Sequence, residues 1–264
     1  MSYVLITGSS RGIGRYLAEE CAKKGLNLIL VSRSENKMKD LAGLFTTQYK
    51  IDVKFLAIDL MQTGAVDELF QWCKKNLLEV RILINNIGYA RWGRFDQLKW
   101  DDIQEIVQLN LSTTLKMCHT FIPMMLTLPN PYILNVASTA GYQPVPFFSV
   151  YAAAKSAIVS FSRSLRAELK KDGINVSVLC PGPTASEFFV NAGFEKKGLT
   201  DSNSVTMEPA KVALEAIEDL FAKKAVIIPG FSNRLGVFFS KHMGTSIILK
   251  LTGNIFKPSK KQKK

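Results

Sequence analysis

Seven short apolar runs, separated by amphipathic stretches, are the feature of this 264-residue sequence that most constrains its fold. Near-continuous apolar strands that alternate with helices are typical of a parallel sheet covered by helices on both faces. We therefore expect a doubly wound α/β fold around a seven-stranded parallel sheet, with right-handed crossovers. The strands are predicted at residues 3–7, 26–32, 53–59, 81–88, 132–138, 174–182 and 225–230, and the helices at residues 16–25, 35–48, 64–75, 101–126, 150–171 and 209–223.

A glycine-rich turn, TGSSRGIG at residues 7–14, lies between the first strand and the first helix. Glycines let the backbone turn sharply and approach a pyrophosphate, and the helix N-terminus that follows offers free N–H groups and a positive dipole end. This placement indicates a dinucleotide-binding Rossmann fold, the alternative being a turn that merely needs flexible residues. The expected cofactor contacts are Gly8, Ser10, Arg11, Gly12, Ile13 and Gly14.

The end of the second strand indicates which nicotinamide cofactor is bound. Folds that bind NAD usually place Asp or Glu here to hold the ribose hydroxyls. This chain has Ser32 and Arg33 instead. A carboxylate would repel a 2′-phosphate, whereas a guanidinium binds it through two hydrogen bonds, and Arg11 adds a second charge. The sequence therefore predicts NADP(H) as the cofactor. The alternative is that Arg11 and Arg33 are merely solvated surface residues.

Tyr151 and Lys155 are four residues apart, so they share one face of a predicted helix. A tyrosine with its ordinary pKa of about 10 is a poor acid or base at neutral pH, and a neighbouring ammonium is expected to lower that pKa. Ser138 ends the fifth strand, and sites in parallel α/β sheets form beyond the carboxyl ends of strands. We expect the ends of strands one, four, five and six to converge there. By itself the tyrosine–lysine pair also fits a solvated helix face.

Together these motifs resemble those of the short-chain dehydrogenase/reductase family, over residues 3 to about 188. The spacing TGxxxGxG resembles the shorter branch of that family. The resemblance implies an NADP-preferring oxidoreductase that acts on CH–OH groups, interconverts a ketone or aldehyde and an alcohol, and forms a homo-oligomer. The motifs follow the family's order: TGSSRGIG at 7–14, DL at 59–60, NNIG at 85–88, Asn110, Ser138, YAAAK at 151–155 and PGPTAS at 181–186.

The resemblance also implies a role for each matching residue. Tyr151 would be the general acid in reduction or the base in oxidation, and Lys155 would lower its pKa and hold the nicotinamide ribose. Ser138 would orient the carbonyl oxygen, and Asn110 would hold a water that links Lys155 to bulk solvent. The other implied cofactor contacts are Asp59 and Leu60 at the adenine, Asn86 and Gly88 beside the cofactor, and Pro181, Gly182 and Thr184 over the nicotinamide.

The composition, 47% hydrophobic and 21% charged, is that of a globular protein. Residues 1–230 are expected to form one catalytic domain, in which the long polar segment 190–206 is typical of a lid. The first residues read as a strand rather than a signal peptide, and no apolar run reaches the roughly 18 residues of a membrane span.

Two distant histidines predict no metal site. Reduced core thiols, and hence a cytoplasmic location, are predicted from Cys21, Cys73, Cys118 and Cys180.

The C-terminal extension, residues 231–264, is apolar and basic. After Asp219 the chain has ten basic residues and no acidic one. One helical stripe is expected over residues 235–251, formed by Leu235, Phe239, Met243, Ile247 and Leu251. The first interpretation is a helix that packs on the body or on a sister subunit. The second is a surface-seeking helix that contacts anionic membrane. No nucleic-acid motif accompanies the charge, so nucleic-acid binding is not expected.

The leading hypothesis for function is an NADPH-dependent ketone or aldehyde reductase. Apolar residues near the predicted lid, Phe188, Phe189 and Phe194, favour an apolar substrate such as a steroid or a fatty-acyl ketone, although core packing explains them equally well. The alternatives are a non-catalytic sensor that binds NADPH and a membrane-surface scaffold that acts through the basic tail. The sequence does not identify the substrate, the physiological direction or the oligomer.

Overall fold

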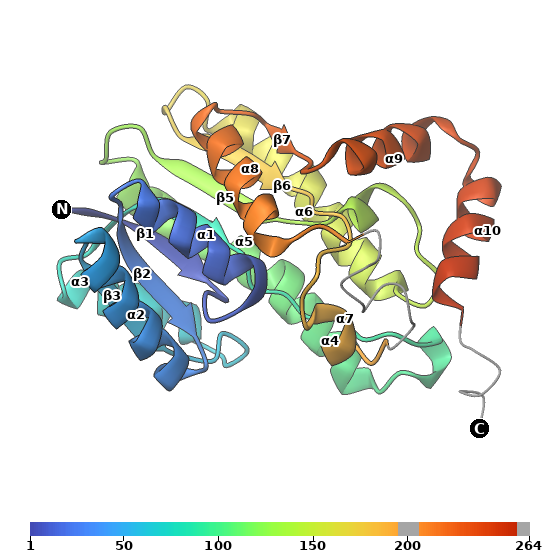
Figure 1. The fold of residues 1–264 in the computed structure, drawn as a ribbon, viewed down its shortest axis with the longest axis horizontal. Helices are drawn as coiled ribbons and strands as arrows, with labels where there is room; N and C mark the ends of the chain where they lie inside the picture. Colours follow the sequence, from blue (N-terminus) through green and yellow to red (C-terminus); the bar gives the residue numbers. More distant parts are fainter. Residues whose placement is uncertain (195–205, 258–264) are drawn as a thin grey trace.

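The computed structural model describes residues 1–194 and 206–257 and confirms the predicted seven-stranded parallel sheet (Figure 1). The strand order is β3-β2-β1-β4-β5-β6-β7, and every neighbouring pair is parallel. Strand order reverses between β1 and β4, and such switch points are where open α/β sheets bind ligands. The strands are β1 (Ser2–Thr7), β2 (Asn27–Ser32), β3 (Val53–Ala57), β4 (Glu79–Asn85), β5 (Tyr132–Val136), β6 (Asn175–Leu179) and β7 (Val226–Ile227).

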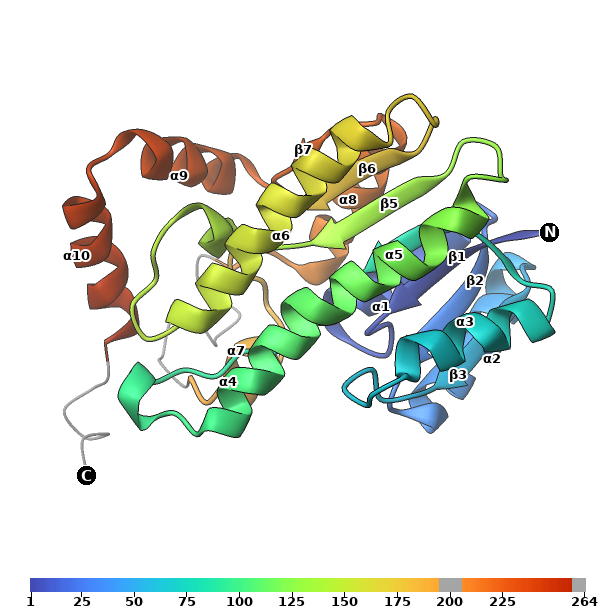
Figure 2. The same ribbon diagram turned by 180° about the vertical axis from the view of Figure 1, so that it is seen from behind.

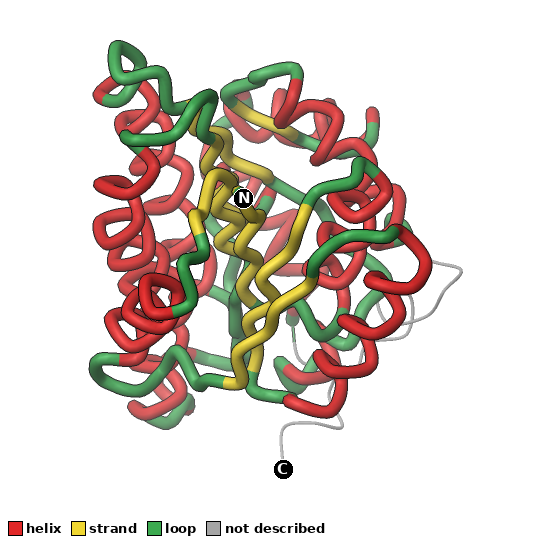
Figure 3. Tube along the Cα trace, turned by 90° about the vertical axis from the view of Figure 1, so that its left-hand side faces the viewer, coloured by secondary structure: helices red, strands yellow, loops and turns green. Residues whose placement is uncertain are grey.

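Helices cover both faces of the sheet, which lies edge-on between them in Figure 3. Alternate residues of β2 supply the two cores: Leu28 and Leu30 face one layer, and Ile29 and Val31 face the other. The first layer contains α1 (Gly12–Lys23), α2 (Glu35–Tyr49) and α8 (Pro209–Phe221). The second layer, which lies in front of the sheet in Figure 2, contains α3 (Ala65–Lys75), α5 (Thr113–Met125) and α6 (Ser149–Glu168).

Several strands end earlier than their apolar runs predict, always at the carboxyl edge. β4 stops at Asn85 rather than at residue 88, because the Asn86 amide donates to the carbonyl oxygens of Thr7 (3.0 Å) and Gly8 (3.2 Å) and leaves the ladder. β6 stops at Leu179 rather than at residue 182. β3 and β5 each end two residues before their predicted ends, and β7 ends three residues before its predicted end. The motif residues therefore lie in loops beyond the strands, where they are free to face a ligand.

The long helix predicted over residues 101–126 is three segments rather than one. It consists of α4 (Trp100–Val107), a π-helical turn (Gln108–Ser112) and α5. Within the turn, the Asn110 amide donates to the Ile106 carbonyl at 2.8 Å. A side chain that bonds to a carbonyl one turn earlier competes with the backbone ladder, and π-turns of this kind are frequent at functional sites.

The prediction of a single helix over residues 235–251 is wrong. Two helices occur instead, α9 (Phe231–His242) and α10 (Thr245–Phe256), separated by an extended Met243 and by Gly244. The predicted stripe therefore does not lie on one helix, and its members are not the packing residues. The residues that these helices bury against the body are Val237, Ile248 and Thr252.

All four cysteines are free and buried, as predicted. Burial raises the pKa of each thiol to about 12. In the parts of the chain that the structure describes, no helix combines the length and the hydropathy that crossing a bilayer requires.

A buried chain of polar side chains joins the central strands to α6. The Asn85 amide donates to Asn135 Oδ1 at 2.8 Å, and the Asn135 amide donates to the Ser162 hydroxyl at 3.0 Å. The Ser162 hydroxyl in turn donates to the Ile158 carbonyl at 2.7 Å. Ser162 belongs to α6, so this series of hydrogen bonds fixes α6 against the sheet. The same helix carries the predicted catalytic pair.

We expect Asn135→Ala to lower the free energy of unfolding by about 2–3 kcal/mol, because it removes the oxygen acceptor of one buried amide and the donor to a buried hydroxyl. The matched control is Asn76→Ala, whose exposed amide donates to Trp72 O at the end of its own helix. This variant should change stability by less than about 0.5 kcal/mol. Urea unfolding followed by circular dichroism measures both. Equal losses for the two variants would contradict the role of the buried chain.

Candidate active site

A cavity of about 1450 Å³ lies along the carboxyl edge of the sheet, at the switch point. The glycine turn, the ends of β2, β4 and β5, the loop after β6 and the first turns of α6 all line it. Of the residues predicted to form the site, Asn110 is the one that does not line the cavity. The structure therefore brings together the four strand ends that were expected to converge.

The glycine turn forms one wall of the cavity. Gly8 (φ +65°) and Gly12 (φ +55°) adopt left-handed backbone angles that residues with side chains rarely adopt. A Cβ at Gly14 would collide with the carbonyl oxygen of Gly8, so α1 starts directly against the turn. This arrangement leaves a bare backbone and a helix N-terminus facing the cavity, which is what binding a pyrophosphate requires.

At the outer end of the cavity, the turn meets the ends of β2 and β3. The Ser32 hydroxyl donates to the Ser10 hydroxyl at 2.7 Å, and Arg33 Nη1 lies 3.8 Å from Asp59 Oδ2. The Arg33 side chain is 64% exposed, so this ion pair is weak and leaves the guanidinium accessible. Lys37 of α2 also lines this end and was not identified from the sequence.

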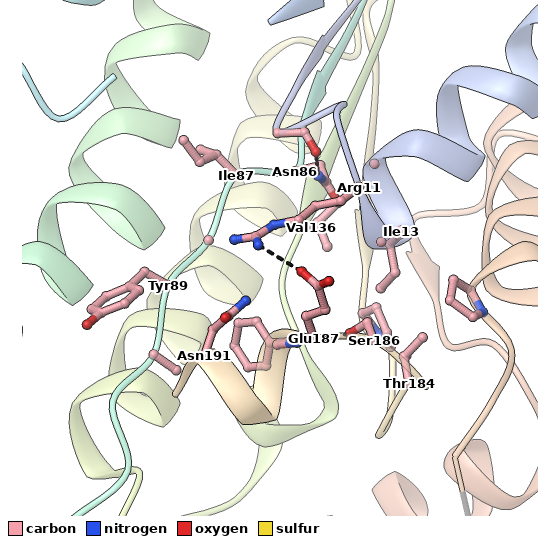
Figure 4. A pocket seen from close by; sticks show the side chains of 18 of the residues that line it. Arg11, Ile13, Asn86, Ile87, Tyr89, Val136, Thr184, Ser186, Glu187 and Asn191 are labelled. Atoms are coloured by element: carbon pink, nitrogen blue, oxygen red, sulfur yellow. Dashed lines mark hydrogen bonds and ion pairs between the residues drawn. The ribbon is translucent and has the colours of Figure 1, made fainter. Parts of the chain in front are cut away.

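Arg11 forms an ion pair across the cavity that the sequence did not predict. Its Nη1 lies 2.9 Å from Oε2 of Glu187, which precedes the short helix α7 (Phe188–Asn191). Figure 4 shows the two side chains reaching toward each other, one from the glycine turn and one from the loop after β6. No local pattern connects residues so far apart in the chain. The pair joins the cofactor-facing turn to the loop that bears PGPTAS.

The predicted catalytic residues lie at the inner end of the cavity. Ser138 precedes a 3-10 turn (Thr139–Tyr142), and its hydroxyl accepts from the Ala140 N–H at 3.1 Å. A Cβ at Gly141 would lie 2.9 Å from the Lys155 carbonyl oxygen, so the absence of a side chain lets the turn pack directly on α6. This packing sets Ser138 near Tyr151, whose pKa the Ser138 hydroxyl lowers. The Ser138 hydroxyl itself donates to the Pro181 carbonyl at 3.4 Å.

Burial sets the protonation of the predicted catalytic pair. It raises the pKa of the Tyr151 phenol to about 12, while the Ser138 hydroxyl acts in the opposite direction. It also lowers the pKa of the Lys155 amine to about 8. Burial is the largest of these effects on Tyr151, and the lowering of its pKa by Lys155 stays a prediction. Lys155 Nζ donates to the Val136 carbonyl at 2.9 Å and lies 5.7 Å from the centre of the Tyr151 ring. At neutral pH the phenol keeps its proton, the state that a general acid needs.

Asn110 lies behind the cavity wall, in the π-helical turn. Its amide donates to the Tyr89 carbonyl at 2.6 Å, and its Oδ1 accepts from the Tyr89 N–H at 3.4 Å. A Cβ at Gly88 would approach Asn110 Oδ1 to 2.9 Å and Lys155 Nζ to 3.4 Å. Gly88 thus keeps open the narrow space between these two side chains. The water that Asn110 is predicted to hold there stays a prediction.

Aromatic side chains surround the remaining side of Tyr151. Its ring centre lies 5.4 Å from that of Phe188 and 6.3 Å from that of Phe148. Phe256 of α10 packs on Phe148 at 5.2 Å, and its carbonyl accepts from the Trp92 indole N–H at 2.8 Å. Thr252 and Ile255 of α10 also line the cavity. Residues of the C-terminal extension therefore form part of the site, which the sequence did not indicate.

Part of the predicted lid segment, residues 195–205, lies outside the described residues. The described start of the segment contributes Asn191 to the cavity lining, and Phe189, directly before the segment, also lines the cavity. Phe194 is buried and lies 5.5 Å from the Trp92 ring, so it is a packing residue behind the wall.

Comparison with known proteins supplies the assignment to a family. The model of the short chain dehydrogenase family matches residues 2–196. The chain belongs to the short-chain dehydrogenase/reductase family. This confirms the resemblance that the motifs indicate, and the expected Rossmann-type fold with it.

Curated members of the short-chain dehydrogenase/reductase family are similar over part of their length. The very-long-chain 3-oxoacyl-CoA reductase of Anas platyrhynchos is 33% identical over 186 residues, which are 68% of this chain and 59% of that protein. Ketoacyl reductase HetN of Nostoc sp. is 34% identical over 181 residues, which are 68% of this chain and 62% of that protein. The chain therefore spans about three fifths of the length of these relatives.

Solved structures of the short-chain dehydrogenase/reductase family match almost the whole chain. A short-chain dehydrogenase from Sphingobium yanoikuyae in complex with NADPH has a TM-score of 0.81 and 25% identity, covering 100% of this chain and 98% of that one. A 7β-hydroxysteroid dehydrogenase has a TM-score of 0.85 at 22% identity, covering 96% of both chains, which shows the shared fold alone.

Proposed function

We propose that this short-chain dehydrogenase/reductase is an NADP(H)-dependent oxidoreductase that interconverts a long-chain ketone, of the 3-oxoacyl type, and its alcohol. The single observation that supports the proposal most is the grouping of Ser138, Tyr151 and Lys155 at one end of a cavity whose other end carries Arg33. A protonated phenol and a hydroxyl thus face the same space as a bare glycine turn.

The cavity fits the cofactor that the fold implies. The cradle formed by Gly8, Gly12 and Gly14 suits a pyrophosphate, and Arg33 with Lys37 suits a 2′-phosphate. Asp59 and Leu60 line the adenine end, and Asn86, Gly88, Pro181, Gly182 and Thr184 line the path toward Tyr151. When bound, a nicotinamide cofactor supplies the hydride that reduces the carbonyl carbon.

The residues of this chain polarise the carbonyl and manage the proton. In reduction, the Ser138 and Tyr151 hydroxyls donate hydrogen bonds to the carbonyl oxygen and stabilise the charge that develops on it. Tyr151 then gives its proton to that oxygen, which completes the alcohol. Lys155, whose pKa is lowered to about 8 by burial, holds an exchangeable proton near neutral pH. Beside Gly88 and Asn110, it is placed to return a proton to Tyr151, and oxidation runs the same steps in reverse.

The apolar wall beside Tyr151 supports a long-chain substrate. Phe148, Phe188 and Phe189 line the cavity together with Phe256 of α10. Two relatives named above act on oxoacyl or ketoacyl groups by their names, and their likeness supports the same substrate class here. A panel of 3-oxoacyl thioesters of increasing chain length, followed by loss of NADPH absorbance, tests the proposal. Lack of turnover for every chain length would contradict it.

The second candidate function is a non-catalytic NADPH sensor, since a sensor would need the same cofactor end of the cavity as an enzyme. The presence of Ser138, Tyr151 and Lys155 together at one end of the cavity disfavours it. Tight NADPH binding without turnover on the whole panel is the result that would select it. The homo-oligomer, the cytoplasmic location and the division at residue 230 stay predictions.

We expect Tyr151→Phe to reduce the rate of ketone reduction at least ~100-fold, the scale of a lost general acid, with NADPH affinity unchanged. Steady-state rates and a fluorescence titration of NADPH measure the two effects. The control is Tyr142→Phe, which alters a nearby phenol that does not line the cavity. Near-normal turnover by Tyr151→Phe would reject its role.

Reduction should slow as the pH rises through about 8, because Lys155 then loses the proton that it returns to Tyr151. Between pH 7 and pH 9 its protonated fraction falls roughly tenfold, and kcat/KM should fall with it. Tyr151, with a pKa of about 12, stays protonated across this range. Lys155→Met should be slow and show no such inflection. A wild-type profile that is flat to pH 10 would contradict the assignment.

Arg33→Asp should weaken NADPH binding relative to NADH by at least about tenfold, because a carboxylate repels the 2′-phosphate. Dissociation constants of both cofactors for the two proteins give the ratio. Arg94→Asp, at a similarly exposed arginine outside the cavity, is the control. An unchanged ratio for Arg33→Asp would count against the contact with the 2′-phosphate.

A further inference from the structure

The helices α9 and α10 lie together at one end of the molecule, beyond the carboxyl edge of the sheet, in both Figures 1 and 2. They are rich in large apolar residues but bury very few of them. Val237 is the one buried residue of α9, and Ile248 and Thr252 are the only two of α10. Such an apolar pair of helices with so little packed surface has an outer face available to a partner.

The exposed face of α9 is a continuous apolar stripe. Phe231, Leu235, Phe238 and Phe239 recur at the spacing that places them on one side of a helix, and they are 73%, 43%, 56% and 48% exposed. On α10, Ile247 (52%) and Leu251 (53%) are also exposed. We call these six residues the outer apolar face.

The charge around the outer apolar face has one sign. Arg234 borders it on α9, and Lys250 and Lys257 lie on or directly after α10. Lys241 of α9 instead turns to the body, where its ammonium lies 4.6 Å from the centre of the Tyr142 ring. Both helices lack any acidic residue. Arg234 lies 3.8 Å from Glu215, whereas no carboxylate of the described residues lies within ion-pair distance of Lys250 or Lys257. An apolar face bordered by unneutralised cations is complementary to an anionic lipid surface.

A second copy of the chain fits this face less well. A symmetric dimer brings the same patch of both subunits together. Here that would place Lys250 and Lys257 of one copy against the basic border of the other, with no carboxylate of α9 or α10 to compensate. Like charges brought together in this way oppose association.

The inner side of α10 connects this face to the substrate. Thr252 donates to the Pro144 carbonyl at 3.2 Å, and the Phe256 ring packs on Phe148, which in turn contacts the Tyr151 ring. One helix of 12 residues thus has an exposed apolar side and a side that lines the cavity. A substrate held in a bilayer under α10 would need to travel only past this helix to reach Tyr151.

We propose that the outer apolar face of α9 and α10 docks on an anionic membrane surface, and that apolar substrate enters the cavity from the bilayer past α10. Docking is independent of the proposed reaction, whereas substrate entry rests on it. The proposal assigns α10 two roles, a wall of the substrate cavity and a contact with lipid.

Deleting the extension would not separate these roles, because it would also remove Thr252 and Phe256 from the cavity. Point variants of the full chain do separate them. Phe238→Glu places a charge in the apolar face, and Lys250→Gln combined with Lys257→Gln removes two cations. The matched control is Leu126→Glu, which charges a side chain of similar exposure (48%) at the end of α5.

Binding is measured by co-sedimentation with vesicles of phosphatidylcholine alone or with phosphatidylglycerol added. The wild type and Leu126→Glu should bind only the anionic vesicles. Phe238→Glu should weaken that binding at least about tenfold, the scale of one phenylalanine kept out of an apolar phase. The double lysine variant should weaken it roughly 30-fold, the scale of two cations near an anionic surface.

Two outcomes would overturn docking. The first is no binding of anionic vesicles by the wild type, or equal binding by all variants. The second is size-exclusion chromatography that shows a wild-type dimer split by Phe238→Glu, which would assign the face to a second copy.

Turnover separates this proposal from the proposed function. With NADPH, Phe238→Glu should reduce a long-chain ketone held in anionic vesicles about tenfold more slowly than wild type, yet reduce a short soluble ketone within twofold of it. Equal loss on both substrates would overturn entry from the bilayer. Vesicle binding as expected, with no turnover of either substrate by wild type, would reject the reductase and leave docking standing.

Discussion

The hydrogen bond from the buried Lys155 amine to the Val136 carbonyl holds the site together. It joins α6 to the last residue of β5, and Lys155 is only 3% exposed. Burying an amine is costly unless its hydrogen bonds are satisfied, so this contact confines the helix to one position. The close approach at Gly141 fixes the other side of the same helix. Tyr151 is thereby held against the sheet, and Ser138 lies two residues beyond the strand to which this helix is tied.

The parts of this architecture that the sequence predicts are those determined locally. Apolar runs predict all seven strands, and the glycine turn predicts the wall of the cavity, because each depends on residues that are adjacent in the chain. Strand ends were predicted too long, since the Asn86 amide that diverts β4 bonds to Thr7 and Gly8, nearly eighty residues away.

Features that depend on distant partners could not be predicted. Nothing near Glu187 indicates that it pairs with Arg11, and nothing near Phe256 indicates that it packs on Phe148. The surroundings of Tyr151 and Lys155 also depend on a distant partner. A spacing of four residues places Lys155 on the same face, but the Val136 carbonyl, which belongs to another element, receives its hydrogen bond. Sequence patterns show which side chains share a face and do not show which acceptor each one selects.

The four buried thiols have a practical consequence. Thiolates are the species that react with alkylating agents and oxidants, and thiols whose pKa is raised to about 12 provide almost none at physiological pH. The folded protein should therefore tolerate maleimides and peroxide at its native cysteines. A cysteine introduced on α9 or α10 would then be the one reactive thiol, so that a fluorescent or spin label could report the depth of these helices without any change to the native sequence elsewhere.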